Sequence, residues 1–263
     1  MNDAPSSVPG VPDPQQIFAR IRNNFLITQE PSPTVQDGSA SAGDDAATAP
    51  LHLSHAAWLA LTLALDKLEA VRALVEDAHR TQPWAHHTLL RSALEHAATA
   101  VWLLAPASRD ERIRRRLKLA GHDVYESGRA QELSGVSPAP PGRLPAERYE
   151  EIRELARARG FEDPDAVLGR FSYVKVVREA ATATALPADV LELLWMTGSG
   201  IAHGRAWATF AMLEHEDVTL DNGDVRQISI SASIEQLTMI AATVLNLVEL
   251  ASALYEQRRS RHH

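Results

Sequence analysis

Hydrophobic residues recur at three- and four-residue spacing over several long stretches of the chain, the pattern of amphipathic helices. One such stretch covers residues 54–79, and a second begins at Pro83 and runs to about residue 106. A final stretch from Ser233 to Gln257 contains no Gly or Pro. Its apolar stripe consists of Leu237, Ile240, Val244, Leu247, Ala251 and Leu254. These spacings predict a bundle of long helices.

Capping residues predict the ends of further helices. Ser108 and Glu111 have the spacing of a capping box, which predicts a helix from there to about residue 130. Proline is common at the first position of a helix, and glycine is common just after the last. On these signals, helices are predicted to begin at Pro145, Asp163 and Pro187, and the first of them to end at Gly160.

Residues 212–231 break the helical pattern. Two strand-like runs flank Asn222-Gly223, a pair that suits the tight type I′ turn of a hairpin. The predicted fold class is therefore all-α, a multi-helix bundle with one β-hairpin.

The first fifty residues differ in composition from the rest. Residues 1–50 are rich in Pro, Ser and Asp, which predicts a mostly disordered segment with a short helix at 17–28. Residues 30–50 have no apolar periodicity and are interpreted as a low-complexity linker. The helical bundle domain is predicted to cover residues 51–258.

Composition limits the classes of function. The chain has 263 residues, of which 45% are hydrophobic and 23% charged, as is ordinary for a globular protein. It has no cysteine, which excludes disulfides, thiolate metal sites and cysteine nucleophiles. A net charge of −8 argues against a surface built throughout for nucleic acid. No secretory signal or uncharged membrane span stands out, so we expect a cytoplasmic protein without membrane contact.

The segment RSALEHAATAVWLL, residues 91–104, contains the first candidate site. Arg91 and Glu95 are four residues apart and lie together on one shoulder of the apolar helix face, whereas His96 falls about 140° round from Arg91. Two interpretations stay open. Arg91 and Glu95 are either a partly buried pair that joins helices or part of a functional site.

The segment TGSGIAHG, residues 197–204, contains the second candidate. Glycine destabilises helices, so three glycines in seven residues indicate a close backbone approach or a helix end. Ser199 and His203 are four residues apart in this segment. Because buried polar groups need partners, we predict that Ser199 and His203 converge with Arg91 and Glu95 in one buried polar cluster. The alternative is a tight helix crossing with His203 near a helix C-terminus.

A basic run at residues 109–118 contains Arg112, Arg115 and Arg116, which face away from Ile113 and Leu117. We interpret these arginines as a solvated helix face, and as the best phosphate-binding surface on an acidic chain.

Metal-binding motifs are incomplete. Glu76 and His79 have the E-x-x-H spacing used in di-iron bundles, but a second E-x-x-H is missing. His122 and Glu126, four residues apart, are the further helical pair. We therefore predict no metal site and no cofactor.

Arg91 and His96 fit the pattern R-x4-H, and on these residues the chain resembles the HEPN superfamily (higher eukaryote and prokaryote nucleotide-binding domains). The resemblance implies a helical bundle and, for many members, metal-independent ribonuclease activity in toxin–antitoxin or phage-defence systems. It implies that His96 moves a proton at the ribose 2′-hydroxyl while Arg91 stabilises charge on the phosphate. More loosely, residues 54–256 resemble uncharacterised helical proteins of high-GC bacteria.

Two classes of function follow. The first is a helical binding or interaction module that holds a small molecule or a partner. The second is a HEPN-like ribonuclease with RNA held by the arginines at 112, 115 and 116. The apolar face of residues 233–257 is wider than a surface helix needs, and together with the HEPN resemblance it predicts a homodimer.

Overall fold

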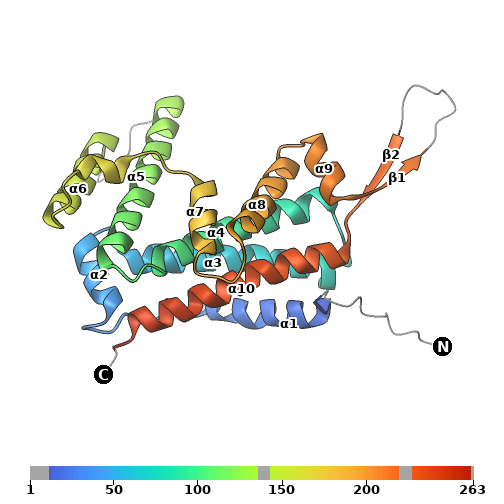
Figure 1. Cartoon of the computed structure of the whole chain (residues 1–263), viewed down its shortest axis with the longest axis horizontal. Helices are drawn as coiled ribbons and strands as arrows, with labels where there is room; N and C mark the ends of the chain where they lie inside the picture. The colour runs from blue at the N-terminus through green and yellow to red at the C-terminus, as the bar shows by residue number, and fades with distance from the viewer. Residues whose placement is uncertain (1–11, 136–142, 219–226, 262–263) are drawn as a thin grey trace.

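The computed structural model describes residues 12–135, 143–218 and 227–261 (Figure 1). In this part of the chain ten α-helices pack together beside one antiparallel hairpin, so the predicted fold class is confirmed. The helices are α1 (Pro14–Phe25), α2 (Ala40–Thr48), α3 (Leu53–Arg72), α4 (Pro83–Leu104), α5 (Arg109–Ser134), α6 (Pro145–Ala158), α7 (Tyr173–Ala181), α8 (Ala188–Ala202), α9 (Ala206–Met212) and α10 (Ile234–Arg259).

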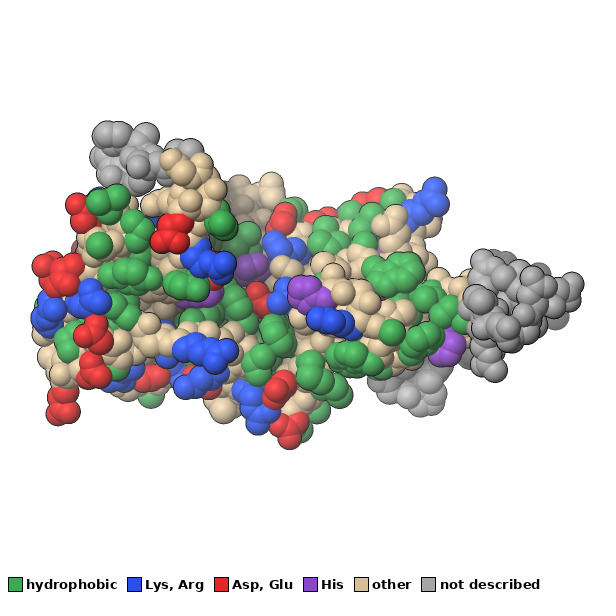
Figure 2. Space-filling view, turned by 90° about the horizontal axis from the view of Figure 1, so that it is seen from above, with side chains coloured by type: hydrophobic (Ala, Val, Ile, Leu, Met, Phe, Trp, Pro, Cys, Tyr) green, Lys and Arg blue, Asp and Glu red, His purple; other side chains and the backbone are tan. Residues whose placement is uncertain are grey.

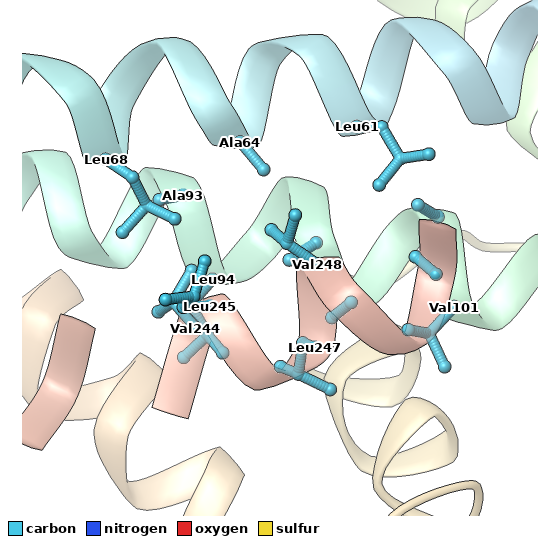
Figure 3. Packing of buried hydrophobic residues seen from close by; sticks show 14 of the residues in the cluster. Leu61, Ala64, Leu68, Ala93, Leu94, Val101, Val244, Leu245, Leu247 and Val248 are labelled. Atoms are coloured by element: carbon cyan, nitrogen blue, oxygen red, sulfur yellow. The ribbon is translucent and has the colours of Figure 1, made fainter. Parts of the chain in front are cut away.

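Helices α3, α4 and α10 form the centre of the main core. Leu68 of α3, Leu94 and Val101 of α4, and Leu245 and Val248 of α10 are at most 1% exposed and lie together between the three helices (Figure 3). Helix α1 packs on α3 and α10, while α7 and α8 pack on α4. The apolar periodicity of the long helices is thus satisfied inside the bundle.

Helix α10 is covered on several sides, because it packs on α4 and also on α3, α1 and α2. By length and composition α10 could cross a membrane, but 56% of its most apolar 18-residue window is buried inside the bundle. Its wide apolar face is therefore used within the chain. Contacts within the chain account for part of that apolar width, and the homodimer stays a prediction.

The predicted cap at Ser108 begins α5, and Ser233 caps α10 in the same way. The hydroxyl of Ser108 accepts a hydrogen bond from the backbone N–H of Glu111 at 3.4 Å, and that of Ser233 accepts one from Gln236 at 3.3 Å. Several boundaries differ from the prediction. Helix α5 continues to Ser134, α3 ends at Arg72 and is followed by a π-helical turn (Ala73–Asp77), and Asp163 caps a short 3-10 turn (Pro164–Leu168) rather than an α-helix.

A second, smaller core lies outside the main bundle. Ile113 and Leu117 of α5, Ile152 of α6 and Val167 of the 3-10 turn are each at most 1% exposed and form one cluster. Helix α5 leaves the bundle at an angle and holds α6 on its far side (Figure 1). The two cores therefore meet along one side of α5.

The prediction of a linker at residues 30–50 is wrong for residues 40–48, which form α2. Asp44 of α2 is 1% exposed and binds Arg112 through both carboxylate oxygens at 2.7 and 2.9 Å. Asp45 accepts hydrogen bonds from the backbone N–H and the hydroxyl of Ser54 at the start of α3. Because polar partners hold this helix, it lacks the apolar periodicity by which helices are predicted.

The hairpin consists of strands β1 (Glu214–Val218) and β2 (Gln227–Ser231), paired antiparallel with Glu214 opposite Ser231. The predicted turn at Asn222-Gly223 lies outside the described residues. The first residue of the predicted hairpin segment, Met212, is the last residue of α9.

Candidate functional site

Arg91 and Glu95 pair with each other on α4, as their spacing predicts. The guanidinium Nη2 of Arg91 lies 2.8 Å from Oε2 of Glu95, and the same oxygen accepts a hydrogen bond of 2.8 Å from the indole N–H of Trp195 on α8. The guanidinium also stacks on Trp195, 5.2 Å from its ring centroid. Glu95 is buried. This Arg–Glu–Trp network joins α4 to α8.

The glycines of the TGSGIAHG segment allow close approach, as predicted. A Cβ atom at Gly198 would lie 2.6 Å from Cβ of Arg91, and one at Gly200 would lie 2.6 Å from Cβ of Ala208. Both distances are shorter than side chains tolerate, so glycine at these positions lets α8 pack closely on α4 and α9. Gly204 has φ +64° and turns the chain after α8.

Ser199 and His203 are not part of the Arg91–Glu95 network. Ser199 is half-buried, and its side chain forms no hydrogen bond with a described residue. His203 is exposed at the C-cap of α8. The prediction that four residues form one buried cluster is therefore wrong for His203, because the helix ends there and its side chain is in solvent.

The arginines of the basic run are not a solvated face. Arg112 is 2% exposed and binds Asp44 and the carbonyl oxygens of residues 106 and 107. Arg115 binds Glu111, Glu179 and the carbonyl oxygen of Trp102. These two side chains fasten α5 to its neighbours, and the prediction of a solvated face is wrong because the helix turns them inward.

Arg116 differs from both. Its Nε donates to the carbonyl oxygen of Leu51 at 2.9 Å and to that of His52 at 3.4 Å, and its side chain lines a large cavity. Burial lowers the pKa of Arg116, although an arginine stays protonated at neutral pH.

This cavity lies where the two cores meet, between α3, α4, α5 and α6, and has a volume of about 660 Å³. That volume is in the range of small-molecule sites. Histidine and hydrophobic side chains are visible in the hollowed region between the α5–α6 part and the α8–α9 part (Figure 2). Among the residues that line the cavity are Leu59, Leu63, His96, Thr99, Arg116, Leu119, His122, Asp123, Glu126, Arg148, Ile152 and Tyr173.

His96 lies in this cavity and not with the Arg91–Glu95 pair. It is half-buried, and its ring nitrogens form no hydrogen bond with a described residue. Desolvation lowers the pKa of His96 to about 4, and the positive charges of Lys67 and Arg91 contribute. The ring is therefore neutral at neutral pH and presents one donor and one acceptor.

An aromatic cluster forms one edge of the cavity. His122 of α5 stacks on Phe171 with ring centroids 4.6 Å apart, and Tyr173 packs edge-on against both rings. On α3 and the residue before it, His55 and His52 stack at 4.8 Å. Planar ligand groups could stack beside such rings.

The metal-binding motifs have other partners. Glu76 forms ion pairs with Arg22 and Arg72, while His79 has a positive φ of 51° just after the π-helical turn. Within residues 12–135, 143–218 and 227–261, no three His, Asp or Glu side chains are grouped in a way that could hold a metal ion.

The chain matches no protein-family model, no curated protein and no solved structure. The resemblance to the HEPN superfamily thus gains no support beyond the all-helical architecture.

Sequence analysis did not predict the cavity. Its lining comes from five separate helices and the segment before α3, and of the eight candidate site residues it includes two, His96 and Arg116. The histidines are the sequence feature that could have indicated it, since His52, His55, His96 and His122 lie near apolar residues in the sequence. That these four side chains line one cavity depends on tertiary packing, which the sequence does not show.

Proposed function

We propose that this protein is a helical binding module that holds a small organic molecule in the cavity between its two hydrophobic cores. The observation that carries the proposal is the cavity itself. Its lining mixes apolar side chains with polar and charged ones, and in ligand sites such polar groups fix the orientation of the bound molecule. His96 and Arg116 bring into it polar groups that have no described protein partner on the cavity side.

The Arg91–Glu95 pair has a different role in this proposal. The Glu95 carboxylate is bound by both Arg91 and Trp195, so the pair braces α4 against α8, although the buried Nε of Arg91 has no partner among the described residues.

The test uses phenylnaphthylamine, an uncharged probe that fluoresces in apolar sites. We expect saturable binding to the wild-type protein. Ala56→Phe places a ring at a half-buried position that lines the cavity, and we expect it to weaken binding at least about tenfold, a free-energy change of about 1.4 kcal/mol. Ala130→Phe, at an exposed position near the end of α5 and outside the cavity, is the matched control and is expected to leave binding unchanged. Equal binding by wild type and Ala56→Phe would contradict the proposal.

A metal-independent HEPN-like ribonuclease is the second candidate. Two observations favour it. His96 lines a cavity and its ring nitrogens have no hydrogen-bond partner among the described residues, so the ring is accessible to a substrate. A smaller pocket of about 110 Å³ includes Arg114, Lys118, Arg170 and Lys175 in its lining. These side chains could contact RNA phosphates, whereas Arg112 is buried.

The ribonuclease is tested by incubating the protein with mixed RNA in the presence of a metal chelator. Cleavage that is lost in His96→Ala, with the variant still folded, is the expected result for this candidate. Absence of cleavage, or equal cleavage by His96→Ala, would eliminate it.

A further inference from the structure

Arg116 carries a charge that the described protein does not pair. Its Nε donates to backbone carbonyl oxygens, but its two terminal amino groups form no hydrogen bond and no ion pair within the described residues. Asp45 and Asp123 lie near enough to favour its charged form, yet neither is within ion-pair distance. A half-buried guanidinium with free donors favours an acceptor that comes from outside.

Other arginines in and beside the second core, unlike Arg116, pair with carboxylates. Arg112 binds Asp44 through two oxygens, Arg115 binds Glu111 and Glu179, and Arg148 binds Asp123. Each of these has a carboxylate partner within 3.2 Å. Arg116 is the exception among them, because its hydrogen bonds within the described residues go to backbone carbonyl oxygens alone, and its side chain lines the cavity.

The acidic residues of the cavity do not fill this role. Asp123 is paired with Arg148, and Glu151 with Arg143. Glu126 is exposed and lies ten residues from Arg116 on the same helix, about 15 Å along its axis. Glu126 is therefore distant from Arg116, and Asp123, which is exposed and nearer, has Arg148 as its partner.

Much of the remaining lining of the cavity is apolar. Leu59, Leu63 and Ile152 line the cavity, and Leu59 is 58% exposed although it is a large hydrophobic residue. His96 is neutral and adds no charge of either sign at neutral pH. A ligand that satisfies both regions has one acidic group and an apolar body.

We infer that the cavity binds an amphipathic organic anion, with its carboxylate, phosphate or sulfonate on the guanidinium of Arg116 and its apolar part against Leu59 and Leu63. The planar fork of a guanidinium matches such oxyanions through paired N–H donors. This inference rests on the proposed function, because it names the ligand class of the same cavity.

The test compares two probes that share their aromatic rings. Anilinonaphthalene sulfonate carries a sulfonate, and phenylnaphthylamine is the same ring system without it. We expect Arg116→Gln to weaken binding of the sulfonate at least about tenfold and binding of the uncharged probe by no more than about twofold. Arg116→Lys retains the charge and is expected to give intermediate sulfonate binding. Displacement of the bound sulfonate by octanoate or by octyl phosphate then distinguishes a carboxylate ligand from a phosphate ligand.

Control variants distinguish failure of the Arg116 inference from failure of the proposed function. Arg157→Gln removes an arginine on α6 that pairs with Glu150 outside the cavity, and it is expected to leave both affinities unchanged. Circular dichroism checks that each variant is folded, and Arg116→Lys keeps the comparison valid if Arg116→Gln unfolds. Equal sulfonate binding by wild type and Arg116→Gln, or an equal loss of both probes in that variant, overturns the inference. If the wild-type protein binds the uncharged probe but not the sulfonate, the inference is overturned while the proposed function stands. If the wild-type protein binds neither probe, the proposed function itself is contradicted.

Discussion

The two hydrophobic cores are held together in different ways. The main core consists of long helices whose apolar faces bury residues such as Leu68, Leu94 and Leu245 almost completely. The second core is a small cluster on α5, α6 and a 3-10 turn, and ion pairs surround it, among them Arg112–Asp44, Arg148–Asp123 and Arg153–Asp165.

This difference explains where the cavity lies. A continuous apolar interface closes around its side chains at high packing density and leaves little space. Helix α5 is fastened at its first turns by Arg112 and Arg115, and between Ile113 and Val124 it also carries the second core. The space between the cores is lined from both sides and filled by neither.

The largest expected effect comes from the ion pair that anchors α5. We expect Arg112→Met to lower the free energy of unfolding by about 3–5 kcal/mol, because it leaves the buried carboxylate of Asp44 without its partner. Urea unfolding measures this change. Arg159→Met, which breaks a more exposed pair with Asp110, is the control and is expected to cost less than about 1 kcal/mol. Equal costs would mean that the Arg112–Asp44 pair does not anchor the helix.

Matched truncations in the two cores sharpen the comparison. Leu94→Ala and Ile152→Ala each remove a buried side chain and are expected to cost about 2–4 kcal/mol. They differ in where the structure loosens. By hydrogen exchange, Leu94→Ala is expected to lower protection throughout the bundle, whereas Ile152→Ala lowers it in α6 and the later turns of α5. Loss of protection throughout the chain in both variants would show that the cores unfold as one unit.

Two Arg–Glu–Trp networks allow a smaller comparison. Glu95 accepts from Trp195 and pairs with Arg91, and Glu179 accepts from Trp102 and pairs with Arg115. We expect Glu95→Gln to cost about 1–3 kcal/mol and Glu179→Gln about 1 kcal/mol or less, because Glu95 is the more buried carboxylate. Thermal or urea unfolding of the two variants measures which substitution costs more stability. The reverse order would contradict the role of burial.

The sequence predicts the elements of the main core well, because long apolar stripes and caps such as Ser108 and Ser233 are local signals. It misses α2, since Asp44 and Asp45 are recognised as helical only through their partners on α5 and α3. The Arg91–Glu95 pair follows from four-residue spacing alone. The environment of Arg116 does not, because spacing on α5 gives no information about which arginine finds a carboxylate.

The pH dependence of stability tests the boundary between the cores. The pKa of His96 is about 4 in the folded protein, below its ordinary value of 6.5. Below pH 6.5 the unfolded chain binds a proton at this residue while the folded protein does not, so stability that is complete above pH 6.5 is lost as the pH falls toward about 4. We expect wild type to lose about 1 kcal/mol more than His96→Gln between about pH 7.5 and pH 5, a value reduced for partial solvation. An identical loss in the two proteins would contradict burial of the neutral ring.

The smallest effect is expected at His203, the residue that the structure removes from the predicted cluster. Its side chain is exposed and forms no hydrogen bond with a described residue, so His203→Ala is expected to change stability by less than about 0.5 kcal/mol. The neighbouring Gly204 has φ +64°, and Gly204→Ala is expected to cost about 1 kcal/mol because alanine is strained there. Urea unfolding of both variants measures the contrast, and binding of phenylnaphthylamine by His203→Ala should equal that of wild type. A loss of probe binding in a folded His203→Ala protein would place His203 in the ligand site and contradict the assignment of that site to the cavity between the cores.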